Sequence, residues 1–235
     1  MSLFEQRVLR AAKEIITSKT DRDMQVSIGP SDMADPCNKC LASKLAGVKP
    51  HREFSMFPWL GTAMHKMIEW TADAVRFRHR PGENDMAWEL FGDGRALFEL
   101  RVLVCEIEDY GEIHGNIDVV LLNEGGIIDW KSTSKKKIAV YKLKGVPDNY
   151  LGQLMLYLFG LRKAGYNMDS GVLVFIPRDA FTPGDIWSYE VKYNQEMVDA
   201  ILGRINQLMA WVKADRWKEL PSDPDCWVCH PRFFG

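Results

Sequence analysis

The chain has 235 residues, of which 46% are hydrophobic and 26% charged, a composition typical of a folded protein with a sizeable core. Its 30 Lys and Arg against 32 Asp and Glu give a formal net charge of −2, so any nucleic-acid-binding surface must be local. The first residues lack the apolar core of a signal peptide, and no apolar run approaches the roughly 20 residues that span a bilayer. These features predict a cytoplasmic protein without membrane contact, whose 5 cysteines are metal ligands or buried thiols rather than disulfides.

The first 95 residues are predicted to be mainly helical. Apolar residues recur at helical spacing over residues 3–19. A second helix is expected to begin at Ser31 or Asp32, either of which is a fair N-cap, and to run to about Ala46. A third extends from Trp59 to about Arg78, followed by a polar segment without clear pattern to Gly94.

From Ala96 onward the hydrophobic period changes to two, which indicates β-strands. Strands are expected from Ala96 and over 114–122, 127–132, 171–177 and 186–193, with helices over 150–164 and 194–217. The sum is one α/β domain spanning residues 1–235, with a mixed central sheet of about five strands flanked by helices. It divides into a helical part (1–95), an α/β core (96–193) and a C-terminal helix with a Cys-containing tail (194–235).

Two acids and a lysine form the most informative pattern in this core. Asp129 and Lys131 point to the same face of their strand because side chains alternate, and a hairpin could bring Asp118 beside Asp129. Hard divalent cations such as Mg²⁺ bind carboxylate oxygens, and a neighbouring lysine could position water for attack on a phosphodiester. A surface Asp/Lys pair on an amphipathic strand is the alternative interpretation.

Four short motifs in chain order resemble the PD-(D/E)XK nuclease superfamily, in particular its RecB-like branch, which includes CRISPR-associated iron–sulfur exonucleases and phage exonucleases. The motifs are Gly-x-x-x-His at Gly61 and His65, an Asp at Asp118, Asp-x-Lys at Asp129 to Lys131, and Gln-x-x-x-Tyr at Gln153 and Tyr157. The resemblance covers roughly residues 30–230 and implies a restriction-endonuclease-like core.

This resemblance implies a role for each motif residue. His65, Asp118, Asp129 and the Trp130 backbone carbonyl would bind Mg²⁺ or Mn²⁺, and Lys131 would activate water. Gly61 would let its helix start close to the sheet. Gln153 and Tyr157 share a helix face and could hold a DNA phosphate or the lysine, or could form a core-facing pair.

Two CxxC pairs, Cys37/Cys40 and Cys226/Cys229, predict a four-thiolate site that joins the N- and C-terminal segments. Thiolate count and spacing alone favour structural zinc. The resembled exonucleases instead bind an iron–sulfur cluster, usually with one N-terminal and three C-terminal cysteines. This chain has two and two, so the resemblance implies a [4Fe-4S] cluster but leaves Zn²⁺ as the alternative. The remaining Cys105 is expected to be a small buried hydrophobe.

Residues 131–144 contain six lysines and no acid, with Lys135, Lys136 and Lys137 nearest the proposed catalytic Lys131. They could lead a DNA strand into the site through sequence-independent phosphate contacts, or they could be an ordinary solvated loop.

The function expected from the resemblance is a metal-dependent DNA exonuclease acting on single-stranded DNA with 5′→3′ polarity. It would serve DNA recombination or repair, phage DNA metabolism or CRISPR spacer processing, in a prokaryotic or phage-infected cell. Partners from recombination or CRISPR adaptation, or a homo-oligomer, are conceivable. The alternatives are a structure-specific or restriction-type endonuclease with the same core, and a non-catalytic nucleic-acid-binding module with a structural zinc site.

Overall fold

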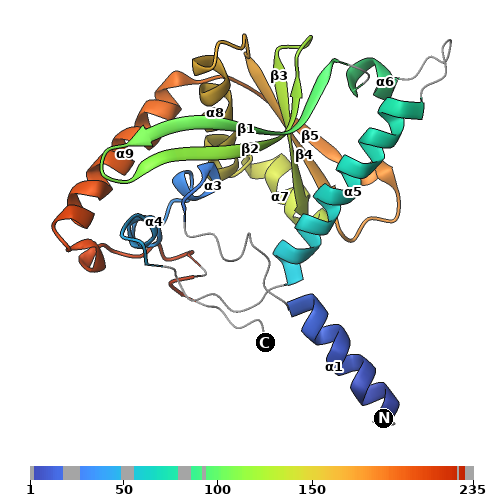
Figure 1. Cartoon of the computed structure of the whole chain (residues 1–235), viewed down its shortest axis with the longest axis horizontal. Helices are drawn as coiled ribbons and strands as arrows, with labels where there is room; N and C mark the ends of the chain where they lie inside the picture. Colours follow the sequence, from blue (N-terminus) through green and yellow to red (C-terminus); the bar gives the residue numbers. More distant parts are fainter. Residues whose placement is uncertain are drawn as a thin grey trace.

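A five-stranded mixed sheet in strand order β1-β2-β3-β4-β5 forms the centre of the computed structural model (Figure 1). The structure describes residues 3–17, 27–48, 56–78, 86–91, 94–226 and 228–230. Its strands are β1 (Ala96–Ile107), β2 (Gly111–Leu121), β3 (Gly126–Thr133), β4 (Ser170–Pro177) and β5 (Trp187–Lys192). Neighbouring strands are antiparallel except β3 and β4, whose parallel pairing requires the helical crossover that joins them. The expected mixed sheet flanked by helices is therefore confirmed.

Helices precede, interrupt and follow this sheet. They are α1 (Leu3–Thr17), α3 (Pro30–Met33), α4 (Asn38–Leu45), α5 (Met56–Arg78), α6 (Met86–Phe91), α7 (Lys135–Lys144), α8 (Asp148–Lys163) and α9 (Gln195–Lys213), with 3₁₀ turns η1 (Pro183–Asp185) and η2 (Trp217–Glu219). Helix α8 packs on β1 and β4 and is itself covered by α9, whereas α5 runs beside β3 (Figure 1). None of the described helices combines the length and apolar character needed to cross a membrane.

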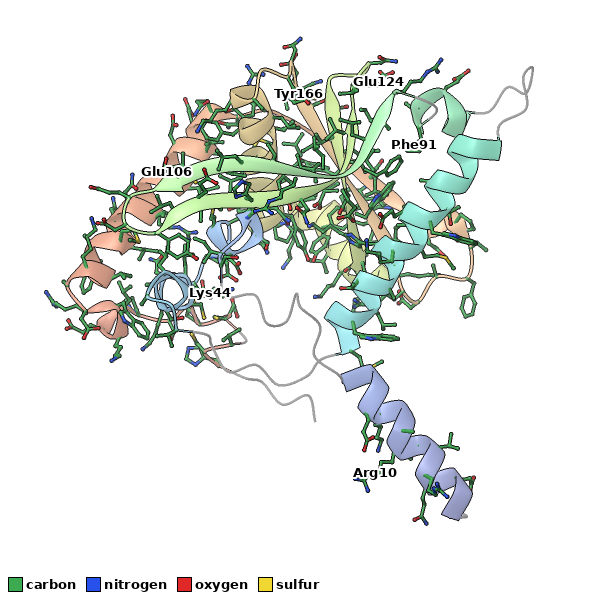
Figure 2. All side chains as sticks on the ribbon, viewed as in Figure 1. Arg10, Lys44, Phe91, Glu106, Glu124 and Tyr166 are labelled. Carbon is green, nitrogen blue, oxygen red and sulfur yellow. The ribbon has the colours of Figure 1, made fainter. Side chains whose placement is uncertain are left out.

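Two hydrophobic clusters cover the two faces of the sheet. Ile127 belongs to the large cluster with α8 and α9, and the next residue, Ile128, belongs to a smaller cluster on the other face. Figure 2 shows Phe91 of α6 beside β1, where its ring lies 6.0 Å from that of Phe98 in the smaller cluster. Because β3 is buried on both faces, polar side chains on it are held rigidly where they occur.

The helix expected from Ser31 or Asp32 to Ala46 is two helices, and neither residue is the N-cap. Gly29 caps α3, and Asp32 instead accepts a hydrogen bond from the Gly29 backbone N–H at 3.0 Å. Pro36 follows α3 and cannot continue it, since its ring fixes φ and removes the backbone donor. The interruption makes Cys37 the N-cap of α4.

Helix α7 occupies the lysine-rich stretch, where the sequence pattern predicts no helix. Ser134 follows β3 directly and caps the helix by accepting a hydrogen bond from the Lys137 backbone N–H at 3.3 Å. Ile138 is the only residue buried within α7, so the apolar periodicity that would reveal a helix is nearly absent.

Candidate active site

Asp118 and Asp129 lie where β2 and β3 separate. The ladder between the strands ends at the Val119–Ile128 pair, and the two acids are the next residues beyond it. Asp118 Oδ2 accepts a hydrogen bond from the Trp130 backbone N–H at 2.7 Å, so a side chain replaces the missing ladder contact. The opening between the strands is therefore lined by carboxylates.

His65 reaches this opening from α5. Its Nδ1 lies 3.1 Å from Asp118 Oδ1. Burial alone would lower the pKa of His65, but the hydrogen bond to Asp118 and the negative charges of Asp118 and Asp129 outweigh burial, so the pKa is raised. Helix α5 begins at Met56, well before Gly61, and a Cβ at Gly61 would only touch Ser132 Cβ at 3.9 Å, so Gly61 does not mark the helix start.

Glu99 on β1 completes a three-residue group that the sequence did not predict. Ligand atoms of His65, Glu99 and Asp118 lie within 4.8 Å of one another. Glu99 has a φ of +49°, a backbone conformation that residues other than glycine rarely adopt in a strand. Its neighbours Phe98 and Leu100 pair with Val119 and Ile117, which places Glu99 opposite Asp118. Burial, followed by the charge of Asp118, raises the pKa of the Glu99 carboxyl.

Lys131 is held between an acid and an amide. Its Nζ lies 2.6 Å from Asp129 Oδ2 and donates a hydrogen bond to Gln153 Oε1 at 2.8 Å. Gln153 Nε2 in turn donates to the Tyr157 hydroxyl at 2.9 Å. Burial raises the pKa of Asp129, while the Lys131 charge opposes the rise. The two motif residues of α8 thus hold the lysine, and Tyr157 is a core residue.

Gly115 allows this arrangement by letting β2 approach two helices closely. A Cβ at Gly115 would lie 2.5 Å from Tyr157 Cε1 and 2.7 Å from Pro30 Cγ. Both neighbours are ring atoms that cannot swing aside, so the chain needs glycine here.

The donor set fits a divalent cation that prefers oxygen. Asp129 Oδ2 is buried and makes no hydrogen bond of good geometry, although Lys131 Nζ lies close to it. It therefore keeps acceptor capacity that a cation could use. Carboxylates from Glu99, Asp118 and Asp129 with the His65 imidazole are ligands that Mg²⁺ or Mn²⁺ accepts, whereas the site offers no thiolate for softer metals.

The lysines predicted to contact DNA lie at the surface, whereas three aromatic rings near them pack against the core. Lys136 and Lys137 are exposed on the first turn of α7, and Lys135 pairs with Asp185 at 2.8 Å. The Trp130 ring packs in the smaller hydrophobic cluster, and Tyr141 and Tyr150 pack against the larger one.

The four predicted cysteine ligands converge from both ends of the described chain. Cys40 Sγ lies 3.4 Å from Cys226 Sγ and 3.3 Å from Cys229 Sγ, and Cys37 Sγ lies 3.7 Å from Cys229 Sγ. All four ligand atoms lie within 4.8 Å of one another, a geometry and donor set that fit a thiophilic metal. His230 is not part of this group, and its Nε2 lies 2.8 Å from Ser222 Oγ.

Comparison with known proteins gives one family and several similar structures. The model of the PD-(D/E)XK nuclease superfamily matches residues 76–232, more than half of the chain. An alkaline exonuclease (LHK-Exo) from Laribacter hongkongensis has 12% identity over 81% of this chain and 90% of its own, with a TM-score of 0.50. The same enzyme in complex with dAMP gives 14% identity, the same coverage and a TM-score of 0.50.

A putative exonuclease from Eubacterium rectale has 13% identity over 92% of both chains and a TM-score of 0.49. No match is found among curated proteins. At these identities the structural likeness concerns the fold alone.

Proposed function

The chain belongs to the PD-(D/E)XK nuclease superfamily, and from this premise we propose that it is a divalent-metal-dependent exonuclease that degrades single-stranded DNA in the 5′→3′ direction. The observation that carries the proposal is the meeting of His65, Glu99 and Asp118 beside the ion pair of Asp129 and Lys131. Action from an end is proposed from the sequence resemblance to the RecB-like exonucleases.

Each side chain has a role that follows from its contacts. His65, Glu99, Asp118 and Asp129, with the Trp130 carbonyl, would hold Mg²⁺ or Mn²⁺. When bound, such an ion polarises the phosphodiester and lowers the pKa of water. Lys131 orients the attacking water and stabilises negative charge that develops on the phosphate, and Gln153 keeps the amine aimed at that position.

The exposed lysines of α7 support a nucleic-acid strand next to this site. Lys135, Lys136 and Lys137 follow β3 directly, so they lie a few residues from Lys131. Their contacts with phosphates would be independent of sequence and weakened by salt. DNA recombination or repair, phage DNA metabolism and CRISPR spacer processing are the settings proposed for such an enzyme, with protein partners or self-association of the chain as further proposals.

Linear and circular single strands separate an exonuclease from an endonuclease. We expect Mg²⁺-dependent release of nucleotides from a linear strand labelled at its 5′ end and no loss of a circular strand. Cleavage of the circular strand would favour the endonuclease alternative. Binding of DNA without cleavage, in Mg²⁺ and in Mn²⁺, would favour the non-catalytic binding module.

Lys131→Ala tests the catalytic assignment. We expect cleavage to fall by about 10²–10³-fold, the size typical of losing one transition-state donor, with DNA binding largely kept. Lys192→Ala is the matched control because Lys192 is exposed, pairs with Glu190 and stands on β5, away from the opening between β2 and β3. Full cleavage by Lys131→Ala in Mg²⁺ would contradict the assignment.

The resemblance implies a [4Fe-4S] cluster with Zn²⁺ as the alternative. Because the cysteine sulfurs lie close together, we propose the alternative, one tetrahedral Zn²⁺, for this group. A zinc ion about 2.3 Å from each sulfur sets the sulfurs about 3.8 Å apart, close to the 3.3–3.7 Å separations of the cysteine pairs. A four-iron cluster occupies more space and would require the thiolates to move apart. Iron and zinc analysis of protein purified without oxygen decides between the two.

A further inference from the structure

The loop that joins β4 to β5 starts close to the proposed catalytic lysine. In the parallel ladder Lys131 pairs with Phe175 and Thr133 pairs with Pro177. The next residue, Arg178, donates from its backbone N–H to the Thr133 carbonyl at 2.9 Å and from Nη1 to Ser132 Oγ at 3.3 Å. Because two residues of a strand span about 7 Å, the loop leaves the sheet at about that distance from Lys131.

Phe181 stands at the tip of this loop with 97% of its surface exposed. The loop is fastened to the start of α7 on both sides of the ring: Asp179 Oδ1 accepts from the Lys135 backbone N–H at 2.9 Å, and Asp185 Oδ2 lies 2.8 Å from Lys135 Nζ. Leaving a phenylalanine in water forgoes the free energy that burial of its apolar surface would provide. A tethered loop that presents such a ring outward indicates a ligand for the ring.

The surroundings of the ring are cationic. Lys135 Nζ lies 5.7 Å from the Phe181 ring centroid. Residues 135–137 and 178–186 together hold four cationic side chains against the two carboxylates of Asp179 and Asp185, which contact Lys135. A single exposed ring among excess cations fits a nucleobase, whose face stacks on the ring while the adjoining phosphates meet the cations. A protein-docking surface would instead show a broad apolar patch.

We propose that Phe181 stacks on an unpaired base of the DNA strand whose phosphate lies at Lys131, and that the start of α7 contacts the neighbouring phosphates. The ring stands three residues from Arg178, a reach of at most about 10 Å, so the stacked base lies within a few nucleotides of the reacting phosphate. This inference rests on the proposed nuclease function and gives it a preference for single strands at this subsite.

Binding of a fluorescent single-stranded oligonucleotide without divalent metal measures the contribution of the ring. We expect Phe181→Ala to weaken binding by about 5- to 100-fold, the range reported by alanine substitution at base-stacking aromatics, and Phe181→Tyr to bind like the native chain. Leu143→Ala is the matched control, because Leu143 is 83% exposed and lies at the far end of α7. Equal loss in Leu143→Ala, or no loss in Phe181→Ala, would overturn the proposal.

A series of oligonucleotides with one abasic site at successive positions identifies the stacked base. In the native chain one position should weaken binding, and the same position should have no effect in Phe181→Ala, because the stacking partner is already absent. An equal abasic effect in both proteins would refute stacking on Phe181. If the native chain cleaves linear DNA while both Phe181 tests fail, the stacking inference alone falls. If it neither binds nor cleaves DNA, the proposed function falls with it.

Discussion

His65 makes the stability of the metal-free protein depend on pH. Its pKa is raised above the ordinary value of 6.5 because Asp118, 3.1 Å from Nδ1, favours the imidazolium. A group with a raised folded-state pKa stabilises the fold fully below its unfolded-state pKa, and that contribution is lost as pH rises through the folded-state value. Without divalent metal, the free energy of unfolding should therefore decline as pH rises above about 6.5.

Urea unfolding of native protein and His65→Gln at several pH values checks this prediction. The variant should lose less stability across that window because glutamine cannot carry the proton. His230→Gln serves as the control and should keep the native slope, since the His230 ring contacts Ser222 rather than an acid in the opening. Parallel curves for His65→Gln and native protein would contradict a protonated His65–Asp118 pair.

Strand alternation is enough to place Asp129 and Lys131 on one face, so these residues could be predicted from sequence. Glu99 could not be predicted in that way, because its positive φ interrupts the pattern of β1. The turn at Asp109 to Gly111 sets the register at the start of the hairpin, but a β-bulge between Leu103 and Cys105 shifts the pairing by one residue. Counting back from the turn would therefore have placed Leu100, not Glu99, opposite Asp118.

At the scale of elements, the site depends on how closely β2 packs against α3 and α8. Gly115→Ala should destabilise the protein by about 1–3 kcal/mol, because the new methyl group would overlap the Tyr157 and Pro30 rings. Moving Tyr157 would also disturb Gln153, so cleavage should fall with stability. Chemical denaturation and a cleavage assay measure the two effects.

Gly203→Ala is the control for this substitution. Gly203 lies inside α9, and a Cβ there would meet nothing within 4 Å. This exchange should stabilise the protein by about 0.5–1 kcal/mol through helix propensity. If the Gly115→Ala variant were as stable as native protein, α3 and α8 could move away from β2 without loss of folding free energy, and the prediction would be wrong.

The elements that the sequence did not predict share a physical cause. Helix α7 buries little more than Ile138, and α6 has only six residues, so neither produces a long apolar period. Strands β2 and β3 and helix α8 were predicted closely because each is buried along much of its length. A hydrophobic period appears in a sequence only where one face of an element is buried. A helix that lies on the surface therefore shows little apolar periodicity.

At the scale of the whole molecule, the cysteine group joins segments that are far apart in the chain. Cys37 and Cys229 are 192 residues apart, yet their sulfurs lie 3.7 Å from each other. Closing so long a loop is entropically costly for the unfolded chain, and a metal that binds only the folded state shifts the equilibrium toward it. The group thereby fastens α4, next to α9, to the C-terminal segment.

Cys229→Ser should therefore lose the bound metal and melt at a lower temperature than native protein. A ligand present at about 1,000 times its dissociation constant contributes about 4 kcal/mol, which corresponds to a decrease of roughly 10 °C for a chain of this size. Cys105→Ala is the control. Burial raises the pKa of the Cys105 thiol to about 11, and the residue lies apart from the four ligands, so metal content should be unchanged. Thermal melting with metal analysis measures both variants, and native metal content in Cys229→Ser would exclude Cys229 as a ligand.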